Sequence, residues 1–150
     1  MSTHAAIIAR TPEGVYQGIY VHSDGYPEHT GKILAKHYAT DERVAALIDL
    51  GDLSFLDKRI APAEGEAHTF RRSADGVTIA YHRDRGEEKR IVASKDLRAV
   101  ADQIDHSYAY VWEDGEWHAM THHELQIELR EREAWEVERA ERAAGWDPNP

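Results

Sequence analysis

Alternating apolar and polar positions predict a β-hairpin near each end of the chain. Residues 3–10 and 15–22 flank the sequence TPEG, whose proline and glycine suit the positions of a tight turn. Farther along, the sequence SYAYVWEDGEWHAM centres on the pair Asp114 and Gly115, which favours a two-residue type I′ turn. That turn would pair the two flanking tryptophans on one face. We therefore expect two antiparallel hairpins.

Apolar residues at helical spacing predict four helices. The first covers residues 33–38, and the second follows Thr40 and ends at a glycine. Ser94 is placed to cap a third helix with a regular apolar face. The last begins with a capping box at Thr121 and continues to about Gly145. Helices therefore separate the hairpins along the chain.

The middle of the chain has the weakest periodicity. Residues 52–76 offer turn residues but no sustained period, so we expect a connecting loop with one helical turn near 53–56. Alternation then predicts a strand over 77–82, and the sequence RIVAS predicts its partner across a turn at Gly86.

Together these elements predict an α+β fold in a single domain that covers residues 1–150. We expect an antiparallel or mixed sheet of five to six strands, with helices packed on at least one face. We expect a long, charged C-terminal helix over residues 121–145 and a flexible tail over residues 146–150.

Composition narrows the function classes. The chain has 150 residues and a formal net charge of -10, which argues against a nucleic-acid partner because phosphate neutralisation needs surplus Lys and Arg. It has no cysteine, so disulfides, thiolate metal sites and a Cys nucleophile are excluded. The sequence contains no membrane-length apolar run and no basic leader. We expect a cytoplasmic protein that does not enter a membrane.

Two similar segments carry the sharpest chemical hypothesis. The sequences YVHSDG and YHRDRG each end in His-x-Asp near a glycine, and on a strand residues two apart share a face. If the segments are neighbours, their imidazoles and carboxylates could serve as bases, orienting groups or metal ligands, with two arginines binding an anion. The candidates are His22, Asp24, His82 and Asp84 for catalysis and Arg83 and Arg85 for binding. The alternative is ordinary turn chemistry, in which Asp bonds nearby backbone N–H groups.

Other catalytic signatures are absent from the sequence. There is no nucleophile elbow, phosphate loop or dinucleotide fingerprint, so we predict no cofactor. The remaining histidines do not have the spacing of a helical zinc site, and we predict no resident metal. A third hypothesis is small-ligand binding on an aromatic face with a polar centre. Its residues are Tyr16, Tyr20, Tyr26 and His22.

The C-terminal helix has more apolar residues than one buried face requires. Leu125 and Leu129 fall on the face that would dock on the sheet, whereas Ile127 and Trp135 lie elsewhere around the helix. Either these two belong to a charged, solvated outer face, or they form a surface for a partner or for a homodimer. Tryptophan is enriched among residues that anchor interfaces.

The segments GIYVHSDGYPEHTGKIL, ALIDLGDLSFL, AYHRDRGE and YAYVWEDGEW, in this order, resemble a family of small, largely uncharacterised proteins from phages and prophage-bearing bacteria. The resemblance covers the chain up to about residue 120 and leaves the last helix outside it. It implies a phage accessory protein that acts on a host component, in the cytoplasm of the host. It implies no established activity and no catalytic residues.

Two hypotheses from different classes follow. The first is a non-enzymatic accessory protein that binds or inhibits a host protein and self-associates through the C-terminal helix. The alternative is a small hydrolase or phosphodiesterase, with or without a metal, that uses the two His-x-Asp strand ends.

Overall fold

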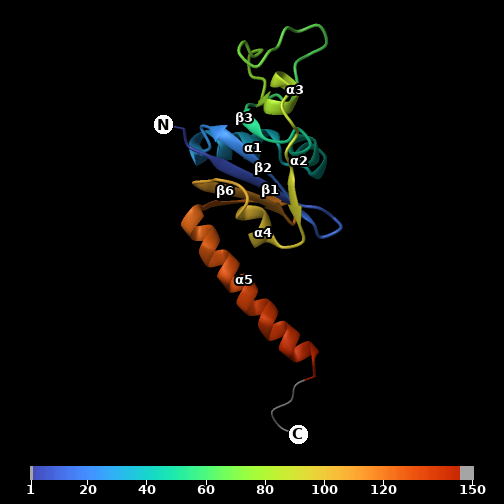
Figure 1. The fold of residues 1–150 in the computed structure, drawn as a ribbon, viewed down its shortest axis with the longest axis vertical. Coiled ribbons are helices and arrows are strands. Elements are labelled where there is room, and N and C mark those ends of the chain that lie inside the picture. The colour runs from blue at the N-terminus through green and yellow to red at the C-terminus, as the bar shows by residue number, and fades with distance from the viewer. Residues whose placement is uncertain (1, 146–150) are drawn as a thin grey trace.

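The computed structural model describes residues 2–145, and these form a mixed seven-stranded sheet with helices on both faces (Figure 1). The strand order is β4-β3-β2-β1-β6-β7, and β5 pairs antiparallel with residues 16–18 of β2, off this path. The α+β prediction is confirmed. The strands are β1 (Ala5–Arg10), β2 (Tyr16–Ser23), β3 (Leu53–Phe55), β4 (Ile79–Ala80), β5 (Val92–Ser94), β6 (Tyr108–Glu113) and β7 (Glu116–Thr121).

Both predicted hairpins are present. β1 pairs antiparallel with β2, and β6 pairs antiparallel with β7, with Trp112 opposite Trp117. Asp114 and Gly115 both have positive φ, of 55° and 77°, as a type I′ turn requires. β1 and β6 pair in parallel and join the two hairpins at the centre of the sheet.

The helices are short except for the last. They are α1 (Lys32–His37), α2 (Asp41–Ile48), α3 (Tyr81–Arg85), α4 (Leu97–Ala101) and α5 (His122–Ala143), with a π-helical turn η1 (Pro27–Gly31) before α1. Thr40 caps α2 by accepting a hydrogen bond from the Arg43 N–H, and the predicted capping box of α5 is formed.

Two apolar clusters lie on opposite faces of the sheet. Alternate residues of β1 point to opposite faces, so Ile7 packs in the cluster with α1 and α2, whereas Ile8 packs in the cluster with α4 and the start of α5. Gly18 permits the second contact, because a Cβ there would lie 2.7 Å from Val100 Cγ1.

The middle of the chain departs from the sequence prediction. Residues 53–55 form strand β3, not a helical turn, and β4 ends at Ala80 where a strand to residue 82 was expected. The segment RIVAS supplies β5, but β5 pairs with β2 and not with β4. Asp96, not Ser94, is the N-cap of α4. The errors in the strands concern pairings that depend on tertiary contacts, which local alternation does not encode.

Helix α5 extends away from the sheet (Figure 1). Leu125 and Leu129 are its only buried residues within the described part of the chain, and every residue of α5 after Arg132 is exposed. The helix ends at Ala143, close to the predicted Gly145. The predicted flexible tail at 146–150 lies outside the described residues.

Among the described residues, no helix is long and apolar enough to span a membrane.

Candidate functional site

The first His-x-Asp segment forms a corner of the chain. His22 lies near the end of β2, but Asp24 follows the strand with a positive φ of 53°, so the two side chains do not share a strand face. The Asp24 carbonyl accepts a hydrogen bond from the Thr30 hydroxyl at 2.8 Å. Gly25 packs against β1, where a Cβ would lie 2.7 Å from the Ala5 Cβ. This corner directs the chain into η1.

The second segment is helical, so the expectation that His82 and Asp84 share a strand face was wrong. His82 is exposed, and its Nδ1 lies 2.7 Å from the Glu87 carbonyl. The Asp84 side chain is only 4% exposed, and its Oδ2 accepts a hydrogen bond from the Ala80 N–H at 2.8 Å. Asp84 therefore satisfies the backbone N–H of Ala80, the residue that precedes helix α3.

Buried Asp84 also holds the long loop between β3 and β4. The His68 side chain, 3% exposed, places its Nε2 3.1 Å from the Asp84 Oδ2, and the Ala74 N–H donates to its Nδ1. Burial alone would raise the pKa of Asp84, but hydrogen bonds from Arg83 and Ala80, together with the nearby His68 side chain, lower it below its ordinary value. The Nδ1 accepts from Ala74 and the Nε2 is buried against Asp84 without a hydrogen bond, so neither nitrogen is exposed to a ligand.

The two predicted arginines are engaged within the fold. Arg83 donates to Asp84 and to the backbone carbonyls of Ile60 and Thr78. Arg85 pairs with Glu87 and lies over the Phe70 ring, with its Cζ 4.3 Å from the centroid. Both guanidinium groups therefore already have partners within the fold.

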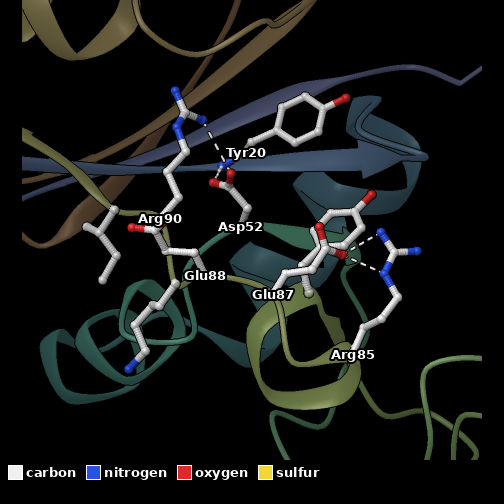
Figure 2. Close-up of a pocket in the computed structure, with 9 residues that line it drawn as sticks. Tyr20, Asp52, Arg85, Glu87, Glu88 and Arg90 are labelled. Atoms are coloured by element: carbon white, nitrogen blue, oxygen red, sulfur yellow. Dashed lines mark hydrogen bonds and ion pairs between the residues drawn. The ribbon is translucent and has the colours of Figure 1, made fainter.

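An open hollow of about 680 Å³ lies between β2, α3 and residues 87–91 (Figure 2). Figure 2 shows Asp52 turned toward Arg90, and Arg85 and Glu87 facing each other. Asp52 accepts the Tyr20 N–H at 2.9 Å and lies 3.3 Å from Arg90. Asp52 pairs with Arg90 and Arg85 pairs with Glu87, and the lining as a whole holds three cationic and three anionic side chains, so it carries no net charge for a ligand.

Tyr20 faces a histidine pair beside this hollow. Burial, with Tyr81, Asp105 and Asp52 nearby, raises the pKa of Tyr20 to about 12, so its hydroxyl keeps its proton at neutral pH. The hydroxyl lies 2.8 Å from the His22 Nδ1, to which it can donate a hydrogen bond. The His22 ring stacks on His4 with centroids 5.0 Å apart. A protonated phenol is a poor nucleophile, so the contact between Tyr20 and His22 is an internal contact of strand β2.

Among the described residues, the four predicted catalytic residues make no hydrogen bond or ion pair with one another. His22, Asp24, His82 and Asp84 make their recorded contacts with different partners. No three His, Asp or Glu side chains of residues 2–145 are arranged to hold a metal ion. Of the aromatic face, Tyr26 packs beside His29, whereas the Tyr16 hydroxyl donates to Glu113 at the other end of β2.

The other candidate surface lies on α5. Trp135 is 59% exposed and Ile127 is 43% exposed, on a helix whose outer half touches little else. Trp135 borders an open hollow of about 470 Å³ between α5 and the β6–β7 turn, which we call the Trp135 hollow. Its other lining residues are charged: Glu113, Asp114, Glu128, Glu131, Arg132 and Glu136. Ile127 lies outside it.

Arg132 fixes one wall of the Trp135 hollow. Its guanidinium donates to Glu113 at 2.8 Å and to Glu128 at 2.9 Å, and Glu113 also accepts from the Tyr16 hydroxyl at 2.6 Å. Burial would raise the pKa of Glu113, but the hydrogen bonds from Tyr16 and Arg132 lower it. In contrast, no cation of the described residues lies within ion-pair distance of Asp114, Glu131 or Glu136.

The sequence predicted the tryptophan of this surface but not its carboxylates. The helical spacing separates Trp135 from the docked leucines, which identifies it as unburied. Glu113 and Asp114 come from the hairpin turn, and their place beside α5 depends on how the helix crosses the sheet. The only sequence signal is the excess of acids, seven against four Lys or Arg, over α5 itself.

Comparisons with protein-family models, curated proteins and solved structures find no match for this chain.

Proposed function

We propose that this chain is a non-enzymatic binding protein that captures a basic segment of a partner protein in the Trp135 hollow, between α5 and the β6–β7 turn. The observation that carries this proposal is the exposed Trp135 at the edge of a hollow lined mainly by carboxylates. Tryptophan side chains are highly buried on average in folded proteins, and interfaces use tryptophan as an anchor.

The chemistry of the Trp135 hollow favours a guanidinium or ammonium group. Asp114, Glu131 and Glu136 lack cationic partners among the described residues, so a basic side chain entering the hollow gains ion pairs without breaking any. The indole face adds a cation–π contact. Arg139 already uses that mode, with its Cζ 5.3 Å from the Trp135 ring centroid.

The charge of the whole chain supports the same partner class. At a net charge of -10 it attracts basic proteins and repels polyanions such as nucleic acid. The resemblance to phage and prophage proteins suggests a protein of the host cell as the partner. We infer that binding, or inhibition through binding, is the biological activity.

No specific observation favours the hydrolase alternative. It needs imidazole and carboxylate groups at one reacting centre, and Asp84 is buried and engaged with His68 and Arg83. The His22 Nδ1 contacts the Tyr20 hydroxyl, and its ring stacks on His4, so no carboxylate of the described residues is placed beside it. The binding proposal requires none of these groups.

Isothermal titration with short peptides tests the proposal. A capped peptide of alternating Arg and Gly should bind, and the same peptide with Glu in place of Arg should not. Trp135→Ala should weaken binding about twofold to tenfold, because an exposed cation–π contact contributes about 0.5–1 kcal/mol and lost apolar contact adds to it. Glu131→Gln, made alone, should also weaken binding of the Arg peptide.

Ile127→Ala is the matched control, because Ile127 is an exposed apolar residue of α5 outside the Trp135 hollow. It should bind the basic peptide like the unsubstituted chain. Equal binding by the Trp135→Ala variant, or equal affinity for the acidic peptide, would overturn the proposed function.

A further inference from the structure

The molecule has opposite charges at its two ends. The loop between β3 and β4 and helix α3 lie at one end of the long axis, and the outer half of α5 lies at the other (Figure 1). Residues 58–85 hold six Lys or Arg against four Asp or Glu, in a chain that is acidic overall. Residues 108–145 hold four against ten. The two ends of the molecule therefore carry net charges of opposite sign.

A turn at Thr69–Arg72, which we call the basic turn, presents the free cations of the first end. The Thr69 N–H donates to the Arg72 carbonyl at 3.1 Å, and the Arg72 N–H donates to the Thr69 hydroxyl at 2.9 Å. Arg71 and Arg72 are exposed, and no carboxylate of residues 2–145 lies within ion-pair distance of either side chain.

The basic turn is held in place by its neighbours. Phe70 packs on Tyr81 of α3 with ring centroids 5.6 Å apart, and buried His68 contacts Asp84 just before the turn. Arg59 and Glu66 form a further ion pair across the loop. A turn ordered in this way loses little conformational freedom on binding, which lowers the cost of association.

We propose that the basic turn of one copy docks in the Trp135 hollow of a second copy, so that the protein assembles head to tail. This inference rests on the proposed function, because it names the basic segment that the Trp135 hollow binds. Arg71 and Arg72 match its free carboxylates in charge, and both sets are unpaired among the described residues. The basic turn belongs to the loop at one end of the molecule, and the Trp135 hollow lies between α5 and the β6–β7 turn, so one copy cannot join its own two surfaces.

A head-to-tail contact has a defined consequence for assembly. Its two surfaces differ, so each bound pair still presents one empty basic turn and one empty Trp135 hollow. Contacts of this heterologous kind extend into open chains or close into rings, unlike a two-fold dimer. Because exposed charges carry the contact, it weakens with salt, as the screening length falls from about 10 Å at 0.1 M to about 3 Å at 1 M.

Sedimentation velocity of the full chain with two single-ended variants tests this assembly. The variant R71E with R72E removes the basic turn, and the variant W135A with E131K removes the Trp135 hollow. At low salt, the mean mass of the unsubstituted chain should rise steadily with concentration. Each variant alone should remain monomeric, and an equimolar mixture should form dimers and nothing larger, because one intact turn meets one intact hollow.

A charge-matched control distinguishes loss of the basic turn from the accompanying change in net charge. The variant K32E with K36E makes the same change in net charge as R71E with R72E, on exposed residues of α1, and should assemble like the unsubstituted chain. Far-ultraviolet circular dichroism of each variant verifies its fold. Assembly lost equally in the α1 variant would contradict a role for the basic turn.

The outcomes distinguish this inference from the proposed function. An unsubstituted chain that stays monomeric at low salt while it binds the Arg peptide overturns head-to-tail assembly and leaves the proposed function standing. Dimers formed by either variant alone also overturn it, because they require a two-fold contact. An unsubstituted chain that stays monomeric and also fails to bind the Arg peptide overturns both the assembly and the proposed function.

Discussion

His68 and Asp84 lie 3.1 Å apart, Nε2 to Oδ2, with side chains 3% and 4% exposed. The pair connects a loop of more than twenty residues between β3 and β4 to helix α3. A loop of that length without regular structure is ordered only if specific contacts hold it. Asp84, a residue that the sequence marked for catalysis, thus stabilises the loop that carries the basic turn.

Replacing Asp84 with Asn should therefore destabilise the protein. The Asn side chain removes the charge that accepts from Arg83 and Ala80 and that faces His68, while it keeps the volume. We expect the free energy of unfolding, measured by urea denaturation, to fall by about 1.5–3 kcal/mol. The control Asp75→Asn alters an exposed carboxylate of the same loop and should change it by less than about 0.5 kcal/mol. Similar values for the two variants would contradict this role.

The corner after β2 should be intolerant of a side chain at Gly25. A Cβ at Gly25 would lie 2.9 Å from the backbone of both Ala5 and Thr3, which cannot move without disturbing β1. We expect Gly25→Ala to lower the free energy of unfolding by about 1–3 kcal/mol. Gly31 is the matched control, because it has helical φ and its nearest neighbour to a Cβ is 3.4 Å away. Equal tolerance at both positions would show that the corner has room to adapt.

Stability should decrease in mild acid because of a histidine pair at the start of α5. His106 Nδ1 lies 2.7 Å from the Ile104 carbonyl, and its Nε2 lies 3.1 Å from the His122 Nδ1. Burial, with His122 adding to it, lowers the pKa of His106 below its ordinary value, against the opposing effects of the Ile104 carbonyl, Asp105 and Asp102.

The unfolded chain therefore binds this proton at about pH 6.5, before the folded chain does. The free energy of unfolding should fall as the pH drops below about 6.5 and should stop responding to His106 below its folded pKa. His106→Asn, which can still donate to the Ile104 carbonyl, should reduce this slope in urea titrations. His123→Asn, at an exposed position, should leave it unchanged. An unchanged slope in the His106 variant would refute this assignment.

Local sequence signals predicted the parts of the fold that depend on neighbouring residues. The type I′ turn needs only Asp114 and Gly115, and the capping box of α5 needs only Thr121 and Glu124. The strand prediction for the segment YHRDR was wrong because these residues form helix α3. The Asp84 side chain accepts from the Ala80 N–H at the start of that helix. No local period reveals the contact with His68, sixteen residues earlier.

The candidate site divides in the same way. The spacing of α5 separates Trp135 from Leu125 and Leu129, so its exposure follows from the sequence. The carboxylates of the β6–β7 turn enter the Trp135 hollow only through the crossing of α5 over the sheet. The Arg132 contact with Glu113 that fixes this crossing joins residues nineteen apart in the chain.

The most direct test of a basic-segment site on α5 is the indole N–H resonance of Trp135 in the unsubstituted, ¹⁵N-labelled chain. The chain has four tryptophans, and Trp135→Phe assigns the signal. On titration with the Arg peptide, this resonance should shift to saturation, while those of buried Trp112 and of Trp117, whose indole N–H donates to the Tyr38 carbonyl, stay in place. A Trp135 resonance that does not move would contradict the proposed site.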